Sequence, residues 1–102
     1  MVTCASRLAL MVERHLLRLL WDLNAWEDYL WWRTQDRKVL TLVNLLITDV
    51  LRHGNEGIGK PEPLKHDVAA YSSRRITDEH RLVYKTTSTE VRIAACRYHD
   101  GR

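Results

Sequence analysis

Apolar residues along this chain occur either in short continuous runs or at helical spacing, and each pattern predicts one kind of element. The stretch 16–21 is almost continuously apolar, which predicts a first strand that is central or well covered in its sheet. A helix follows, capped by Asp22 or Asn24, and its apolar side chains recur at helical spacing to about Thr34. The chain is therefore expected to begin with a strand and a helix.

Asp36 marks the start of a second predicted helix. Apolar side chains recur after it at three- and four-residue intervals, and Gly54 is placed to end the helix. Residues 54–70 hold three of the four glycines and both prolines, which predicts a loop with a stiff middle. Beyond this loop the sequence predicts three strands, the last two joined by a turn at 87–89: 71–76, 81–86 and 91–98.

The order of these elements indicates the fold class. A strand, two helices and then a three-stranded antiparallel meander predict an α+β domain with a mainly antiparallel sheet. With 102 residues, of which 45% are hydrophobic, the chain is long enough for one domain with a modest core. We expect that domain to span 16–102, with residues 1–15 as a flexible N-terminal extension.

Charge and cysteine content narrow the classes of function. The formal net charge of +3 suits an anionic partner, although many ordinary domains have a similar charge. Two cysteines, Cys4 and Cys96, do not make a disulfide framework and fit a reducing cytoplasm. No apolar run approaches the roughly 20 residues that a membrane span requires, so we expect a cytoplasmic protein that does not bind membranes.

Three residues in the second half have the chemistry of metal-independent RNA cleavage. Glu62 lies between Pro61 and Pro63, which restrict the backbone, so its carboxylate is held at little entropic cost. Cleavage by internal transfer requires a base for the 2′-hydroxyl, positive charge for the crowded phosphorane and an acid for the departing 5′-oxygen. Glu62, Arg81 and His99 can fill these roles in that order.

The register of the last hairpin decides whether these groups can meet. Arg81 and His99 share a face if paired residue numbers sum to an even value, as when Arg81 lies opposite Arg97. An odd register would separate them unless a bulge intervened. If they share a face, Arg81, Arg97 and His99 form one cationic patch. The planar fork of an arginine suits phosphate oxygens.

The same residues also have plainer interpretations. A Pro-Glu-Pro loop is most often a solvated turn, and arginines at strand ends are most often solvated or paired with carboxylates. His66, His80 and Cys96 lack the spacing of a zinc site, so we predict neither a metal ion nor another cofactor. Composition and pattern alone lead to a small basic α+β domain that could bind RNA.

Several stretches of the sequence closely resemble the YoeB (Txe) family of bacterial toxins, within the RelE/ParE superfamily. The resemblance runs from about residue 17 to residue 99, and the matching stretches keep the same order, which makes it highly specific. They are Trp26-Glu27-Asp28-Tyr29-Leu30 with Trp32, Gly59 to His66, Arg74 to Tyr84, and Ile93 to His99.

This resemblance implies a RelE-like fold, related to the microbial ribonucleases. It implies a ribosome-dependent endoribonuclease that cleaves mRNA in the 30S decoding site and stops translation. It also implies a cognate antitoxin of the YefM/Phd type, whose C-terminal segment wraps the toxin, and it leaves open whether the toxin forms a homodimer.

The family's functional residues can be carried over position by position. The family's general base, transition-state stabiliser and general acid fall on Glu62, Arg81 and His99. Lys65 and Arg75 match positions that help to orient or neutralise the phosphate. The full set that we expect to bind RNA or phosphate is Lys65, His66, Arg74, Arg75 and Arg97.

Two places depart from the family pattern. Asp100 stands where the family commonly has an aromatic residue, and its carboxylate beside His99 is expected to reduce activity or shift its pH dependence. Tyr71-Ser72-Ser73 lacks a tryptophan of the usual aromatic pair, which weakens the expected contacts with bases or ribosome. Two other functions stay open: a ParE-like toxin that inhibits DNA gyrase, and a non-catalytic module that binds nucleic acid or antitoxin.

Overall fold

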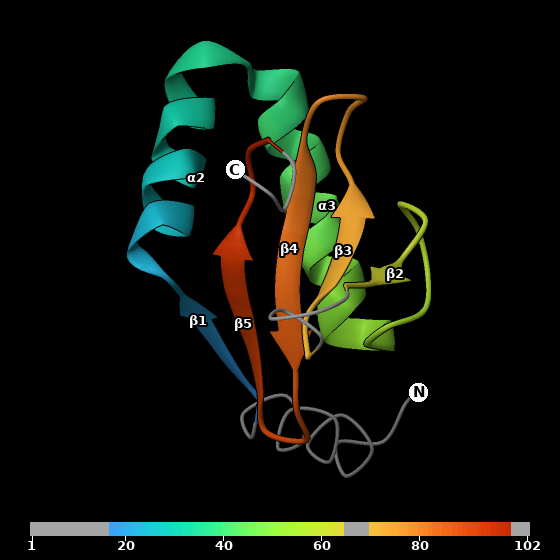
Figure 1. The fold of residues 1–102 in the computed structure, drawn as a ribbon. Helices are drawn as coiled ribbons and strands as arrows, with labels where there is room; N and C mark the ends of the chain where they lie inside the picture. Colours follow the sequence, from blue (N-terminus) through green and yellow to red (C-terminus); the bar gives the residue numbers. More distant parts are fainter. Residues whose placement is uncertain (1–16, 65–69, 99–102) are drawn as a thin grey trace, which may run out of the picture.

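The computed structural model describes residues 17–64 and 70–98, and the structural statements below refer to this part of the chain. The expected N-terminal extension lies outside the described residues, as do Lys65, His66 and His99. The described chain forms an α+β domain with two helices and a mixed five-stranded sheet (Figure 1).

Both helices lie where the apolar spacing predicts them. Helix α2 spans Leu23–Gln35 and helix α3 spans Arg37–His53. The Asp36 side chain caps α3 by accepting hydrogen bonds from the backbone N–H groups two and three residues later, at 3.0 and 3.2 Å. Gly54 ends this helix with a positive φ of 63°, which glycine adopts without steric cost. Neither helix in the described ranges is both long and apolar enough to span a membrane.

The sheet contains the predicted three-stranded meander and one further strand at each edge. Its order is β1-β5-β4-β3-β2, with β1 parallel to β5 and the other neighbours antiparallel. The strands are β1 (Arg18–Trp21), β2 (Glu62–Pro63), β3 (Ser72–Arg75), β4 (Arg81–Thr86) and β5 (Glu90–Ala95). The short strand β2 falls within the stretch predicted as a loop. Two residues are too few to show a strand pattern in the sequence, and this strand is defined by its pairing with β3.

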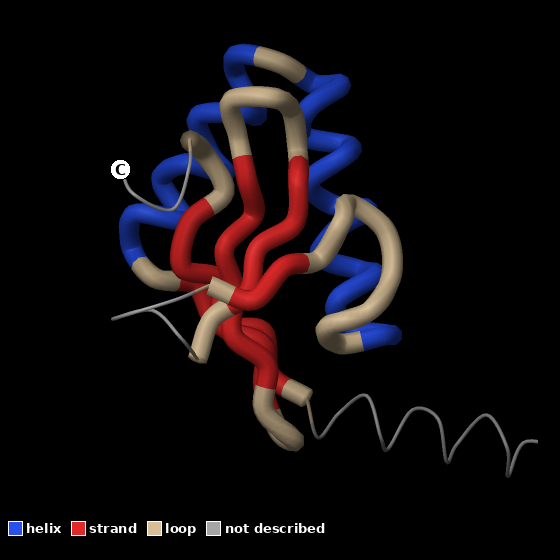
Figure 2. The backbone as a smooth tube through the Cα atoms, turned by 45° about the vertical axis from the view of Figure 1, so that its right-hand side comes forward, coloured by secondary structure: helices blue, strands red, loops and turns tan. Residues whose placement is uncertain are grey.

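The helices form one layer against a single face of the sheet (Figures 1 and 2). Helix α3 lies behind the middle of the sheet, and α2 packs against β5 and α3. No helix of the described chain covers the opposite face. The core lies between the two layers and is made by these buried side chains: Ala25, Trp32, Val43, Leu46, Ile47, Val50, Ile76, Leu82, Tyr84, Val91, Ile93 and Cys96.

The prediction that the first strand is central is wrong. Strand β1 lies at the edge of the sheet, and Leu19 and Leu20 remain 39% and 40% exposed. A short apolar run has the same appearance in a central strand and in an edge strand that lines a groove, so the pattern does not separate the two. Leu19 lines such a groove beside α3.

A bulge between β4 and β5 changes the register within the last hairpin. Near the turn, Tyr84 lies opposite Ile93. One residue earlier in β4, Val83 lies opposite Ala95, so Ala94 is the extra residue. Paired numbers therefore sum to an odd value near the turn and to an even value beyond the bulge. Strand β5 ends three residues earlier than predicted, and the chain continues as a bend.

Candidate active site

Three expected site residues, Glu62, Arg75 and Arg81, share one face of the sheet. Directly opposed residues point to the same face, as do alternate residues along one strand. Glu62 is opposite Ser73 in β3. Arg75 lies two residues further along β3 and is opposite Arg81 in β4. The residues of β4 that point the other way pack in the core, so this face lies away from the helices.

The two arginines on this face hold their guanidinium groups differently. Arg81 is half-buried, and its Nη1 donates a hydrogen bond of 3.2 Å to Oγ of Ser73, the residue opposite Glu62. Arg75 is exposed, and its Nη2 donates to Oδ1 of Asp78 at 2.7 Å. Because an exposed ion pair contributes only about 0–1 kcal/mol, the Arg75 side chain can exchange Asp78 for another anion at little cost. Arg81 is the more preorganised charge of the two.

Arg74 points to the helix side of the sheet, and the expectation that it binds RNA phosphate is wrong. Its side chain has 0% exposure. Its guanidinium group donates hydrogen bonds to the Asp49 carboxylate and to the phenol oxygen of Tyr84. It also donates to three backbone carbonyls at 2.6, 2.8 and 3.1 Å, those of Gly54, Glu56 and Ile58. A buried guanidinium group engaged in this way has no surface to offer to a phosphate.

Arg74 instead fixes the loop that leads to Glu62. This loop runs from the end of α3 to β2 (Figure 2) and wraps around the guanidinium group with three of its carbonyls. Gly57 has a φ of 128°, and a Cβ atom at this position would collide with the Asp49 carboxylate. Lys60 also has a positive φ, of 50°, a conformation that non-glycine residues adopt mainly where the surroundings impose it. The catalytic candidate Glu62 therefore follows a tightly determined backbone.

Asp49 links the stability of this loop to pH. The hydrogen bond from Arg74 holds the pKa of the Asp49 carboxyl below its usual value of 3.8, although desolvation opposes this. A carboxyl whose pKa is lowered by folding stabilises the protein above its unfolded pKa. That stabilisation is lost as the pH falls through the lower, folded pKa.

We expect Asp49→Asn to lower the melting temperature at pH 7 and to have a smaller effect at an acidic pH well below 3.8, where the stabilising contribution of the ionised carboxylate is lost. Thermal unfolding followed by circular dichroism at both pH values measures the difference. Asp78→Asn is the matched control, because it removes a carboxylate from an exposed pair with Arg75. Equal destabilisation by Asp49→Asn at both pH values would contradict the link.

The backbone immediately before His99 is tied to the start of β4. The N–H group of Tyr98 donates to Nδ1 of His80 at 2.8 Å. The carbonyl of Tyr98 accepts from the backbone N–H of Arg81 at 2.9 Å. His99 itself lies outside the described residues, but the residue to which it is bonded is held beside the expected charge stabiliser.

Arg97 is directed toward helix α2 and not toward a patch shared with Arg81. Although the even register beyond the bulge is the one required for such a patch, β5 ends at Ala95. The guanidinium carbon of Arg97 lies 3.9 Å from the ring centre of Trp31 and 4.9 Å from that of Tyr98. Arg81 is bonded elsewhere, to Ser73. The single patch predicted from the hairpin is therefore replaced by two separately held arginines.

Two residues that organise this face were not identified from the sequence. Ser73 binds Arg81, and His80 accepts from the backbone of Tyr98. Position gives a signal for His80, since it directly precedes Arg81, whereas Ser73 gains its role only through pairing with two other strands. In residues 17–64 and 70–98, no three His, Cys, Asp or Glu side chains gather as a metal site.

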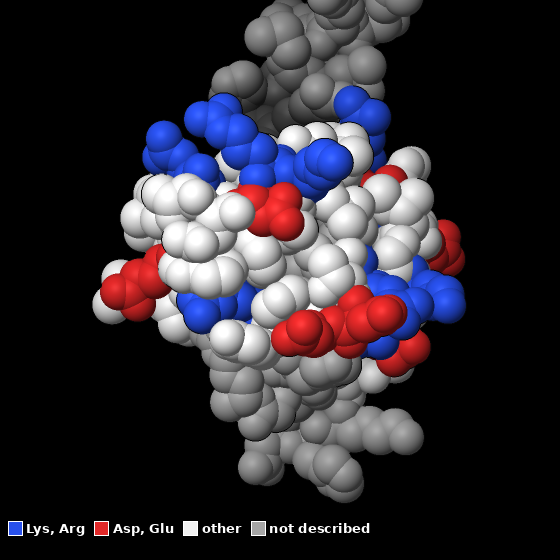
Figure 3. Space-filling view, turned by 90° about the horizontal axis from the view of Figure 1, so that it is seen from above, with Lys and Arg blue, Asp and Glu red and all other residues white. Residues whose placement is uncertain are grey.

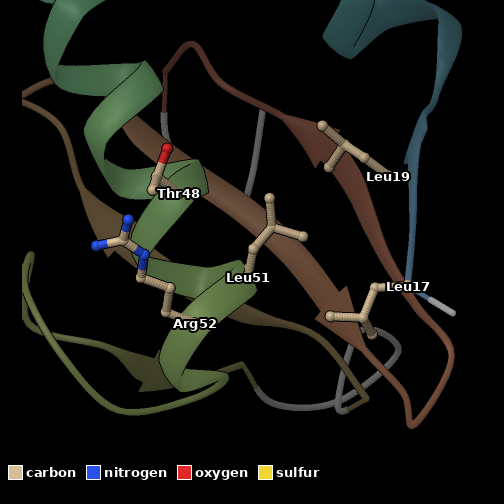
Figure 4. Close-up of a pocket in the computed structure, with 5 residues that line it drawn as sticks. All are labelled: Leu17, Leu19, Thr48, Leu51 and Arg52. Atoms are coloured by element: carbon tan, nitrogen blue, oxygen red, sulfur yellow. The ribbon is translucent and has the colours of Figure 1, made fainter. Parts of the chain in front are cut away.

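Other surface features lie apart from this face. A groove between β1 and α3 is lined mainly by apolar side chains, and it lies at the sheet edge opposite to β2 and Glu62 (Figure 4). Its lining residues are Leu17, Leu19, Thr48, Leu51 and Arg52. Seen from above, basic side chains gather along one side of the described surface with an acidic group directly beside them, and acidic and basic side chains adjoin one another on the other side (Figure 3). The Glu62 carboxylate and the Arg75 and Arg81 guanidinium groups lie on the sheet face and not in the groove.

Comparison with known proteins gives these features a family context. The family model for the YoeB-like toxin of bacterial type II toxin–antitoxin systems matches residues 21–100. Toxin YoeB of Escherichia coli K12 is 51% identical over 83 residues, which cover 81% of this chain and 99% of that protein. The predicted α+β, RelE-like fold is confirmed by superposition on solved toxins of this kind.

Two solved structures from Staphylococcus aureus are similar over nearly their whole length. The YoeB dimer gives a TM-score of 0.77 at 43% identity, over 81% of this chain and 97% of that one. The heterotetrameric YoeB–YefM toxin–antitoxin complex gives a TM-score of 0.76 at 43% identity, with the same coverage of 81% and 97%.

Proposed function

Because the chain belongs to the YoeB-like toxins of bacterial type II toxin–antitoxin systems, we propose that it is a ribosome-dependent endoribonuclease that cleaves mRNA in the decoding site. The sheet face away from the helices supports this most strongly. It carries the Glu62 carboxylate and the Arg75 and Arg81 guanidinium groups, and the backbone bond from Arg81 to Tyr98 ties the start of the His99 segment to it. A toxin that only blocked another protein would not need a base and an acid here.

In the proposed reaction, the Glu62 carboxylate accepts the proton of the 2′-hydroxyl while the 2′-oxygen attacks the adjacent phosphorus. Arg81, assisted by Arg75, stabilises the extra negative charge on the resulting phosphorane. The bond from phosphorus to the 5′-oxygen then breaks, and His99 donates a proton to that oxygen. One fragment ends in a 2′,3′-cyclic phosphate, which hydrolysis opens to a 3′-phosphate, and the other begins with a 5′-hydroxyl.

The way in which the charges are held supports the proposal. The hydrogen bond from Arg81 to Ser73 orients the guanidinium group before substrate arrives, so little reorganisation is needed during the reaction. Arg75 is exposed and only loosely paired, which suits a group that must adjust to a phosphate. Lys65 and His66 follow Glu62 closely in the chain, and we propose that they bind neighbouring phosphates of the message.

We propose that a YefM/Phd-type antitoxin neutralises this toxin and that the toxin can form a homodimer. The similar Staphylococcus aureus proteins support both statements, because one structure is a YoeB dimer and another is a complex of YoeB with YefM. The ribosome and mRNA are the proposed partners of the free toxin, and translation places its action in the cytoplasm.

Primer extension on an mRNA translated with and without the purified toxin tests this function. We expect cuts within the coding region that carry a 5′-hydroxyl and that require ribosomes. A DNA supercoiling assay with the same preparation distinguishes RNA cleavage from gyrase inhibition. Ribosome binding without product, or inhibition of supercoiling without cleavage, would overturn the proposal.

A further inference from the structure

Tyr98 has a backbone conformation that needs external support. Its φ is 64°, in the left-handed region that residues with a side chain rarely adopt. Such conformations are costly and persist only where surrounding contacts impose them. The residue immediately before His99 is therefore held by its environment.

Two hydrogen bonds supply this support, and they come from His80 and Arg81 at the start of β4. The Tyr98 carbonyl accepts from the N–H group of Arg81 at 2.9 Å, and the Tyr98 N–H donates to Nδ1 of His80 at 2.8 Å. A ring nitrogen that accepts a hydrogen bond carries no proton, so this contact requires Nδ1 of His80 to be unprotonated. In this arrangement Nδ1 of His80 is the acceptor for the Tyr98 N–H group.

His80 is itself firmly placed. Its backbone N–H donates to Oγ1 of Thr77 at 3.2 Å, and its carbonyl accepts from the N–H groups of Ile76 and Thr77 at 2.9 and 3.1 Å. Its ring meets the buried ring of Trp32 edge-on, with 4.8 Å between the ring centres. It also lies 5.1 Å, centre to centre, from the ring of Tyr98. The imidazole therefore connects the core to the end of the described chain.

Trp32 fixes the same segment at a second point. Its indole Nε1 donates to the carbonyl of Cys96 at 2.8 Å, two residues before Tyr98. The buried Trp32 side chain thus contacts both the His80 ring and the backbone of Cys96, two residues before the one that His80 binds. Trp32 therefore holds the bend that follows β5 against the core.

We propose that His80 is a positioning residue for the cleavage reaction. Through Nδ1 it holds the Tyr98 backbone, and so it sets where the segment carrying His99 begins relative to Arg81. This inference rests on the proposed function for its effect on rate, whereas the hydrogen bond itself can be tested separately. His80 does not touch the reacting atoms in this proposal.

Two substitutions separate the acceptor from the ring. His80→Asn keeps an acceptor, because the Asn Oδ1 atom occupies nearly the position of Nδ1, but it loses the ring contacts with Trp32 and Tyr98. His80→Phe keeps an aromatic ring for those contacts but has no acceptor. A role in packing alone would favour the phenylalanine, and a role in positioning would favour the asparagine.

Single-turnover cleavage on mRNA-programmed ribosomes gives the first measurement. We expect His80→Phe to reduce the maximal rate by about 10- to 100-fold with little change in half-saturating toxin concentration, because the acid is misplaced and binding is retained. His80→Asn should restore most of this rate. A wild-type rate for His80→Phe, or equal losses in both variants, would overturn the proposal.

Nuclear magnetic resonance of the free toxin gives a measurement that does not depend on activity. We expect the ¹⁵N shifts of His80 to report an unprotonated Nδ1. We also expect slow hydrogen exchange of the Tyr98 amide in the wild type and in His80→Asn, and faster exchange in His80→Phe. Equal protection in both variants would overturn the positioning role. Protection as expected, together with a wild-type protein that cleaves no mRNA, would refute the proposed function and the effect of His80 on its rate, while supporting the hydrogen bond by which His80 holds the Tyr98 backbone.

Discussion

Arg81→Ala is expected to lower the single-turnover rate of mRNA cleavage by about 10²- to 10³-fold, the usual cost of removing one preorganised donor to a developing negative charge. Arg81 is half-buried and already oriented by Ser73, so water cannot supply an equivalent group in its place. Arg81→Lys should recover only part of the loss, because an ammonium group lacks the planar fork of the guanidinium group.

Arg18→Ala is the matched control for this experiment. It removes the same charge from an exposed position on β1, at the sheet edge opposite to Glu62. We expect its cleavage rate to stay at the wild-type level. Glu62→Gln should fall by about 10²- to 10⁴-fold as a test of the general base. If Arg81→Ala and Glu62→Gln stayed folded and cleaved at the wild-type rate, the assignment of this face as the active site would be wrong.

Arg74→Met is expected to lower the free energy of unfolding by about 3–5 kcal/mol, because it removes the fully buried cation of an ion pair whose carboxylate is partly buried. The Asp49 carboxylate loses its cation, and three carbonyls of the loop from α3 to β2 lose a donor. For a domain of this size such a loss corresponds to a fall in melting temperature of roughly 12 °C or more. Denaturant titration and thermal unfolding measure it.

Arg75→Met separates stability from chemistry at the neighbouring position. The substitution is chemically identical, but Arg75 is exposed and its guanidinium group is paired with the exposed Asp78, so stability should change by at most about 1 kcal/mol. Cleavage should nevertheless fall, because this guanidinium group lies on the proposed active face. Similar stability losses in both variants would contradict the distinction between a buried and an exposed arginine.

Local signals in the sequence were sufficient for the helices and for one strand. Asp36 and Gly54 mark the ends of α3 because capping depends on the residues within one turn. Strand β4 has the predicted bounds, Arg81–Thr86, since polar turns lie on both sides of its short apolar run. These elements depend little on the rest of the chain.

Pairings between distant residues were not available from the sequence. The edge position of β1 depends on its parallel pairing with β5, about seventy residues later in the chain. Strand β2 exists only because Glu62 and Pro63 pair with β3. Register, in particular, follows from where the bulge falls, and no residue type in β5 marks Ala94 as the extra one.

The placement of the candidate site residues was only partly predictable from the sequence. Glu62 and Arg81 lie on one face as the hypothesis requires, whereas Arg74 and Arg75 alternate across the sheet and have opposite environments. The sequence shows two adjacent arginines, and only the position of the helices reveals which of them is buried. The role of His80 has the same origin, because a bend after β5 brings Tyr98 back to it.

The pairing of the first strand with the last also determines when this protein can exist as a folded molecule. During synthesis, β1 leaves the ribosome first and has no neighbour among the described strands until β5 has emerged. An incomplete copy also leaves one edge of β4 unpaired, and exposed strand edges invite aggregation and proteolysis. Fragments that end before β5 are therefore expected to be degraded. We therefore expect interrupted synthesis to yield no copy with a complete sheet.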